Sequence, residues 1–360
     1  MTRYLLAGGG TAGHVNPLLA VADRIREREP DAAISVLGTE EGLEARLVPL
    51  RGYELVTVPK LPFPRRPNLA ALRFPGTFSR LVAQIRAIIR EREIDVVVGF
   101  GGYVSAPAYV AARREKTPIA IHEANAKPGI ANRLGSRLSG YVGVAFRGTR
   151  LPHARFVGMP LRREIARLDR RASRAEALAF FGLDDRRPTL LVTGGSQGAR
   201  HLNEIVRESA AVIIGAGWQI LHIVGDRFEA DGSELAHYHL LAYCDRMDLA
   251  FAATDCAVTR AGSATVSELT ALAVPAVYVP FPFGNGEQRL NAADAVRAGA
   301  AVLVDDARFT GEWVSRELIP LLENRVLLAE MGARAVPIGV LDGADRMVEL
   351  VTDALRGRVG

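Results

Sequence analysis

Leu5-Leu6-Ala7-Gly8-Gly9-Gly10-Thr11-Ala12-Gly13-His14-Val15-Asn16-Pro17 is the stretch on which our interpretation of the chain depends. It predicts an apolar strand, a glycine-rich turn and then a helix over residues 17–29. Such a turn exposes backbone N–H groups beside the positive end of a helix dipole, so it favours an anionic or strongly polar ligand. His14 adds a titratable side chain at the helix start, where a phosphate-binding loop needs none.

The same pattern of strand, turn and helix recurs along the whole chain. A second glycine turn, at residues 194–199, opens a second half that repeats the alternation of the first. We therefore predict an α/β fold with two Rossmann-like domains, whose parallel sheets face each other across a cleft and are joined near residues 158–165. Ligands of such sheets bind beyond the carboxyl ends of the strands, where all the glycine turns fall.

Length and composition agree with a globular protein of two domains. The chain has 360 residues, of which 49% are apolar and 24% charged, and two domains are the usual arrangement at this length. Cys244 and Cys256 lack metal-ligand spacing, so we expect reduced thiols in a cytosolic protein and no metal site. We expect no signal peptide and no membrane span. The net charge of +5 permits an acidic partner without choosing among nucleotides, nucleic acids and anionic lipids.

A dinucleotide site is one alternative for the first turn, because Gly8, Gly10 and Gly13 fit G-x-G-x-x-G. That motif needs an acidic residue at the end of the second strand, about 20 positions further on. The position falls near residues 37–39, and the first acids are Glu40 and Glu41. The poor fit disfavours an NAD-dependent oxidoreductase.

The turn at residues 260–268 is a better nucleotide site. It follows a predicted strand and opens a helix, whose first N–H groups suit a diphosphate, while Glu268 can accept hydrogen bonds from two ribose hydroxyls. The alternative is an ordinary helix cap by Ser263 or Thr265. Further along, Gln288 and Asn291 lie one helical turn apart and suit sugar hydroxyls, unless they are only a polar helix start.

Residues 60–92, which we call the basic–apolar segment, carry seven arginines among aromatic and aliphatic side chains. A basic rim around exposed apolar groups suits a surface that rests on anionic lipid. Alternatively, the aliphatic residues between 81 and 89 are only the buried face of a helix over residues 77–92. The apolar residues from Phe63 to Phe78 are harder to explain as core.

Together these motifs resemble the MurG family of peptidoglycan N-acetylglucosaminyltransferases over nearly the whole chain. The stretches that carry the resemblance follow the family's order and lie at residues 9–17, 101–107, 122–125, 158–162, 194–199, 260–268 and 287–292. The resemblance implies a GT-B fold. An acceptor domain would span residues 1–160, with the last helix, about 343–360, packed back on it. A donor domain would span residues 161–342.

The activity that the resemblance implies is an inverting transfer of GlcNAc from UDP-GlcNAc to undecaprenyl-diphospho-muramoyl-pentapeptide (lipid I), which gives lipid II in peptidoglycan biosynthesis. No cofactor, metal or nucleic acid is implied. The basic–apolar segment would rest on the anionic cytoplasmic face of the cell membrane, which makes the protein peripheral.

The resemblance also implies substrate contacts from both domains. From the first domain these are Thr11, Ala12, Gly13 and Asn125 at the donor sugar, whereas Arg162, at the start of the second domain, would contact the nucleotide. From the second they are Ser196 and Cys244 at the nucleotide, Ser263, Ala264 and Thr265 at the diphosphate with Val266 and Ser267 in the same turn, Glu268 at the ribose, and Gln288 and Asn291 at the sugar. For His122 and Glu123, buried or capping roles are favoured over catalysis.

An inverting transfer needs a base for the acceptor hydroxyl and stabilisation of the departing UDP. His14 is our candidate base, because a helix N-terminus disfavours the imidazolium form. The alternative is that His14 only positions a substrate. Another GT-B enzyme such as a UDP-GlcNAc 2-epimerase would need several acid–base residues and no lipid-facing surface. A non-catalytic nucleotide-sugar sensor would not need His14, Glu268 and Gln288 together.

Overall fold

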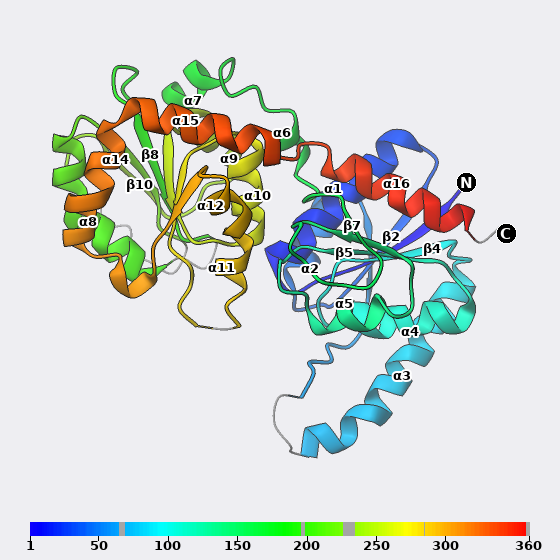
Figure 1. The fold of residues 1–360 in the computed structure, drawn as a ribbon. Coiled ribbons are helices and arrows are strands. Elements are labelled where there is room, and N and C mark those ends of the chain that lie inside the picture. Colours follow the sequence, from blue (N-terminus) through cyan, green and yellow to red (C-terminus); the bar gives the residue numbers. More distant parts are fainter. Residues whose placement is uncertain (65–68, 196–198, 226–234, 284, 358–360) are drawn as a thin grey trace. The chain divides into compact units, whose positions relative to one another are not determined.

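The computed structural model describes residues 1–64, 69–195, 199–225, 235–283 and 285–357. The chain divides into two compact units, Met1–Arg163 with Leu341–Gly360, and Glu164–Val340. Each unit is built on one parallel sheet flanked by helices (Figure 1), so the predicted α/β class with two parallel-sheet domains is confirmed.

The first unit holds a seven-stranded sheet in the order β3-β2-β1-β4-β5-β6-β7, and all its strand pairs are parallel. Its strands are β1 (Arg3–Ala7), β2 (Ala33–Gly38), β3 (Glu54–Thr57), β4 (Val96–Gly99), β5 (Ile119–Glu123), β6 (Tyr141–Val144) and β7 (Ala154–Phe156). Its helices are α1 (Ala12–Arg28), α2 (Leu43–Leu50), α3 (Leu69–Glu91), α4 (Ser105–Glu115), α5 (Ile130–Gly135) and α16 (Gly343–Arg356).

Alternation along β1 divides the core of this unit between the two faces of the sheet. Tyr4 and Leu6 join a cluster that includes α1 and α16, whereas Leu5 and Ala7 join a cluster that includes α3 and α4. The last helix therefore belongs to the first unit and lies beside α1 (Figure 1). Its Asp345 accepts a 2.7 Å hydrogen bond from Nε of Arg24 on α1.

The second unit holds a six-stranded parallel sheet in the order β10-β9-β8-β11-β12-β13. Its strands are β8 (Thr189–Thr193), β9 (Gln219–Ile223), β10 (Tyr238–Leu241), β11 (Cys256–Thr259), β12 (Ala276–Tyr278) and β13 (Ala301–Leu303). The α-helices after the first unit are α6 (Arg163–Ala166), α7 (Arg174–Phe181), α8 (Arg200–Gly215), α9 (Met247–Ala253), α10 (Ser263–Ala271), α11 (Glu287–Asn291), α12 (Ala293–Arg297), α13 (Gly311–Trp313), α14 (Ile319–Glu323) and α15 (Arg325–Ala335). Two short 3₁₀ helices, η1 (Asp306–Arg308) and η3 (Val336–Ile338), and a π-helix, η2 (Val314–Leu318), lie among them.

Two helices begin earlier than their sequences predict. The first starts at Ala12 instead of residue 17, so Pro17 lies inside α1. A proline there removes one backbone hydrogen bond, to the carbonyl of Gly13, and burial of Val15 and Leu18 on the same helix compensates for that loss. The other, α3, starts at residue 69 instead of 77 and contains Pro75.

The basic–apolar segment divides into two parts along α3. Leu81, Val82, Ile85 and Ile89 are buried in the core, so the plain interpretation of the second half of this helix is correct. The first half extends away from the sheet (Figure 1). Among the described helices, none combines the length and the apolarity that a membrane span requires.

Candidate active site

Three neighbouring strands of the first sheet, β1, β4 and β5, end in the loops that the sequence singles out. Gly10, Gly101 and Gly102 all have positive φ angles, of 90°, 93° and 86°. A Cβ atom on Gly102 would lie 2.6 Å from the carbonyl oxygen of Gly9. The loops after β1 and β4 therefore pack backbone against backbone, which only glycine allows here.

His14 lies in the first turn of α1, against these loops. Its Nδ1 is 3.2 Å from the carbonyl oxygen of Gly9 and 3.2 Å from Oγ1 of Thr11. A carbonyl can only accept, so a hydrogen bond to it requires the tautomer with the proton on Nδ1, and in the neutral ring the lone pair is then on Nε2. The Nε2 edge faces Gly101, where an added Cβ would lie 3.1 Å from that nitrogen. The backbone thus fixes both the orientation of the imidazole and the nitrogen that can accept a proton.

Glu44, on α2, is a site residue that sequence reasoning missed. Its fully buried carboxylate accepts hydrogen bonds from the N–H of Gly10 (2.8 Å), and from the N–H (3.0 Å) and hydroxyl (2.8 Å) of Thr39. Burial opposes its ionisation, but these hydrogen bonds outweigh burial and lower the pKa of Glu44. The glycines at 9, 38 and 42 are the sequence feature that could have indicated Glu44, because a Cβ atom at any of these positions would overlap its side chain.

This carboxylate also decides the dinucleotide alternative. It occupies the Gly10 N–H that a pyrophosphate would use, and its negative charge lies directly beneath the turn. A cavity of about 210 Å³ lies beside the turn, with Lys60 and Tyr103 among its lining residues. The ammonium of Lys60 is 3.6 Å from the carboxylate of Glu41 and 5.9 Å from the ring centroid of Tyr103.

The other predicted positions that fall in the first unit lie in three separate segments. Ala12 and Gly13 are the first two residues of α1, and Ala12 is not among the residues with a positive φ, so its backbone accommodates the methyl group. Asn125 follows β5, and its N–H donates to Glu123 at 2.9 Å. Arg162 lies at the end of this unit, directly before α6.

His122 and Glu123 have the structural roles that the sequence favours. Nε2 of His122 donates to the carbonyl of Gly158 at 3.0 Å, and complete burial lowers the pKa of the ring to about 4. Glu123 accepts from Gly129 N–H at 2.9 Å and from Nδ2 of Asn132 at 3.0 Å, which orders the loop after β5.

In the second unit, the start of α10 is open to a ligand. Its N-cap is Gly262, which has no side chain, and no side-chain cap occurs there among the described residues. The first backbone hydrogen bond runs from Val266 N–H to the carbonyl of Gly262. The N–H groups of residues 263–265 precede it, and the capping by Ser263 or Thr265 that the sequence allowed is not what the structure shows. Glu268, in the next turn, is buried with 9% of its surface exposed, and Ser267 is half-buried.

Gln288 and Asn291 differ in what their side chains contact. The Oε1 atom of Gln288 accepts from the N–H of Phe281 at 2.9 Å, so its NH2 group is the half of the amide suited to donate to a ligand. Asn291 is buried, and its Nδ2 donates to the carbonyl of Ala261 at 3.3 Å, which supports the turn before α10. Cys244 is buried in the loop after β10, and Ser196 lies outside the described residues.

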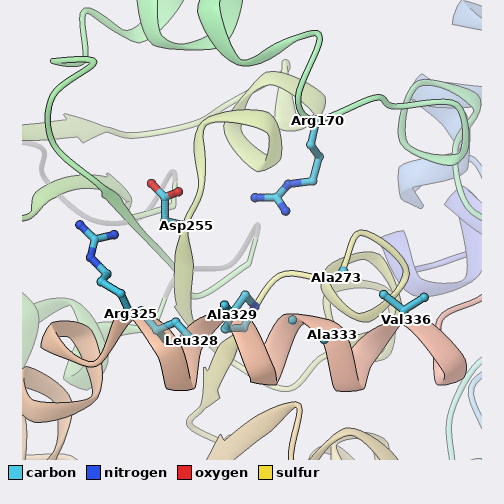
Figure 2. Close-up of a pocket in the computed structure, with 10 residues that line it drawn as sticks. Arg170, Asp255, Ala273, Arg325, Leu328, Ala329, Ala333 and Val336 are labelled. Carbon is cyan, nitrogen blue, oxygen red and sulfur yellow. The ribbon is translucent and has the colours of Figure 1, made fainter.

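A larger cavity, of about 550 Å³, lies at the opposite edge of the second sheet (Figure 2). Its lining includes Asp255, directly before β11, and Pro275, directly before β12, so it is at the amino ends of the strands. Arg170 donates there to the carbonyls of Phe251 and Leu272, at the ends of α9 and α10. Arg170 therefore has a structural role in this cavity, since it joins the ends of two helices. The cavity is also remote from the edge where parallel sheets bind ligands.

Neither cysteine is disulfide-bonded, and both are buried. Burial raises the pKa of Cys256 to about 12, so its thiol is unreactive. The described residues contain no cluster of acidic, histidine and cysteine side chains that could hold a metal ion.

Comparison with known proteins adds to this geometry. Residues 4–143 match the glycosyltransferase family 28 N-terminal domain, and residues 189–347 match the glycosyltransferase family 28 C-terminal domain. A curated relative from Leifsonia xyli subsp. xyli is 63% identical over 355 residues, with 99% of each chain covered. It is named UDP-N-acetylglucosamine–N-acetylmuramyl-(pentapeptide) pyrophosphoryl-undecaprenol N-acetylglucosamine transferase.

Solved structures extend the comparison. The crystal structure of Acinetobacter baumannii MurG matches with a TM-score of 0.80 and 28% identity, covering 98% of this chain and 100% of that one. A UDP-GlcNAc 2-epimerase from Neisseria meningitidis, bound to UDP-GlcNAc, matches with a TM-score of 0.70 over 98% of this chain and 100% of that one. Its identity is only 15%, so that likeness concerns the fold alone.

Proposed function

The chain belongs to glycosyltransferase family 28, and we propose that it transfers GlcNAc from UDP-GlcNAc to lipid I, giving lipid II. The observation that carries the proposal is the 63% identity, over 99% of both chains, to a relative named for that reaction. The GT-B fold is shared with the Acinetobacter baumannii enzyme. The epimerase alternative is not favoured, because only the fold supports it.

We propose that the second unit binds the donor at the carboxyl edge of its sheet. The N–H groups of Ser263, Ala264 and Thr265 would hold the diphosphate, and their uncapped position at a helix N-terminus supports this role. Glu268 would accept from the ribose hydroxyls, and the NH2 of Gln288 would donate to the sugar. The buried Asn291 would act through the Ala261 carbonyl that it holds.

The first unit would then bind the acceptor lipid and supply the catalytic base. Nε2 of His14 would take the proton of the acceptor hydroxyl as that oxygen forms its bond to the anomeric carbon of GlcNAc. The bond from that carbon to the diphosphate oxygen breaks with inversion, and UDP leaves with the electron pair. The donor groups of α10, with Arg162, would stabilise the charge that develops on UDP.

The test is release of UDP from UDP-GlcNAc, measured with and without a lipid I analogue. The proposal predicts release that depends on the acceptor and a disaccharide lipid product in equal amount. Release of free sugar or of ManNAc without acceptor would instead identify a hydrolase or an epimerase.

We further propose that the protein is peripheral at the cytoplasmic face of the membrane and docks through the basic–apolar segment. Phe74 lies between Phe63 and Phe78, with ring centroids 5.3 and 5.7 Å away, and Leu72 is 80% exposed. Arg73 and Arg80, on the same half of α3, are exposed. An apolar cluster with exposed cations beside it suits anionic lipid headgroups. Arg65 and Arg66 of this segment lie outside the described residues.

Co-sedimentation with vesicles that contain anionic lipid tests the docking surface. The double substitution Arg73→Glu and Arg80→Glu should lower the bound fraction, because each basic residue near such a surface contributes about 1 kcal/mol. Arg46→Glu, at an exposed position on α2, is the matched control and should bind as the wild type does. Equal binding by all three proteins would show that another surface docks.

A further inference from the structure

Four loops meet at the proposed donor edge of the second unit, and one carboxylate connects three of them. Asp306 begins η1, just after the edge strand β13, and its side chain is only 14% exposed. It forms an ion pair through Oδ1 with Nη1 of Arg260, which follows β11. Its Oδ2 lies 3.2 Å from Nδ1 of His201, in the first turn of α8.

Arg260 extends this connection to the loop after β12. Its Nη1 donates to the carbonyls of Val279 (3.1 Å) and Pro280 (3.3 Å). The guanidinium carbon is 5.8 Å from the ring centroid of Phe281, whose N–H in turn holds Oε1 of Gln288. The residue thus contacts the segment that leads to a predicted sugar-binding side chain.

Burial makes the carboxylate important. Arg260 is 8% exposed, and its Nε is buried without a hydrogen-bond partner among the described residues. Asp306 is its one anionic partner there. A buried cation needs its counter-ion, because desolvation otherwise makes the charge costly. Loss of the carboxylate would therefore displace the guanidinium and release the carbonyls of residues 279 and 280.

We propose that Asp306 is a positioning residue for donor binding. It holds Arg260, and through it the loops after β11 and β12, in the arrangement that receives the nucleotide sugar, while its second oxygen contacts the helix start after β8. The inference rests on the proposed function, because the donor is assigned there. Neither the glycine motifs nor the family resemblance draws attention to Asp306, which follows a short edge strand in an otherwise ordinary turn.

The test compares Asp306→Asn with the wild type in acceptor-dependent UDP release. The substitution keeps the side-chain shape and removes the charge. The KM for UDP-GlcNAc should rise about tenfold or more, whereas the KM for the lipid I analogue should stay within about twofold. Asp306→Glu, which keeps the charge, should restore part of the donor affinity. Asp294→Asn, which removes a more exposed partner of Arg297 on α12, is the control and should match the wild type.

The outcomes separate this inference from the proposed function. A folded Asp306→Asn variant with unchanged donor KM, or with equal rises in both KM values, overturns the positioning role. If that variant does not fold, Asp306→Glu and Arg260→Lys decide, because wild-type donor KM values in both would also overturn it. If the wild type itself shows no acceptor-dependent release, the proposed function fails. Calorimetric titration with UDP then decides, since equal affinity of wild type and Asp306→Asn would refute the positioning role.

Discussion

Replacing Glu44 by Gln tests how the first glycine turn is held. The wild-type carboxylate receives three donors, from Gly10 N–H and from the N–H and hydroxyl of Thr39. A glutamine has one acceptor oxygen. If that oxygen stays with Thr39, its NH2 group faces the Gly10 N–H, and two donors meet in a buried place. The glycines at 9, 38 and 42 enclose the side chain and leave it no other position.

The magnitude follows from these contacts. A hydrogen bond to a charged group contributes about 1.5–3 kcal/mol, and an unsatisfied buried donor costs about 1–3 kcal/mol. We therefore expect the free energy of unfolding to fall by about 3 kcal/mol at pH 7. The turnover number should fall about tenfold, because displacement of Gly10 also moves the Gly9 carbonyl that orients His14. The donor KM should change little, since the donor is assigned to the other unit.

Urea unfolding at several pH values is the assay. The folded pKa of Glu44 is lowered, so its contribution to stability is present above the unfolded pKa, near 4.3, and is lost as the pH falls through the folded value. The difference in the free energy of unfolding between the wild type and Glu44→Gln should thus become smaller at acid pH. Glu41→Gln changes an exposed carboxylate beside the same cavity and is the control. Equal stability and equal turnover of the two variants would show that the Glu44 carboxylate does not hold the glycine turn.

Two further predictions concern the first unit. His122 is neutral when folded because burial lowers its pKa to about 4, whereas the unfolded ring titrates near 6.5, so acid favours the unfolded chain. Between pH 6.5 and 4 the protonation of His122 should lower the free energy of unfolding of the wild type by about 3 kcal/mol. Urea unfolding of His122→Gln should show a fall over this pH range that is smaller by the same amount. Parallel dependences of stability on pH in the two proteins would contradict this prediction. Gly102→Ala should destabilise by about 2 kcal/mol or more, because φ is +86° and the new Cβ would meet the Gly9 carbonyl. Gly76→Ala, in open space on α3, should be neutral or stabilising, and equal melting temperatures of the two alanine variants would argue against the close packing of the two loops.

Periodicity was sufficient for most of the fold, because buried parallel strands are short and β-branched and the helices between them are amphipathic. It failed where proline lies inside a helix. We expected these helices to start at residues 17 and 77. Each backbone hydrogen bond lost at Pro17 or Pro75 is outweighed by apolar contacts elsewhere on the helix, which no local rule includes. Periodicity alone also left open which domain the last helix packs on, and its contacts with α1 answer that question.

Glycine turns indicated the candidate edge of each sheet, because positive φ angles and close backbone approach require glycine, which is recognisable in a sequence. The residues that support those turns have no comparable sequence pattern. Glu44 and Asp306 act through atoms brought together only by the fold, from an ordinary helix and an edge turn. Asn291 belongs with them, since its spacing from Gln288 suggested a ligand contact while its Nδ2 holds the Ala261 carbonyl.

The turnover number of His14→Ala, with both substrates saturating, shows directly whether His14 is the catalytic base. The Gly9 carbonyl, 3.2 Å from Nδ1, favours the tautomer with the proton on Nδ1, in which Nε2 is the acceptor. A general base of this kind contributes about 100-fold to 10,000-fold. The turnover number of the variant should therefore be at least about 100-fold lower, with the donor KM little changed. An unchanged turnover number would contradict the catalytic role of His14 and would assign it to positioning alone.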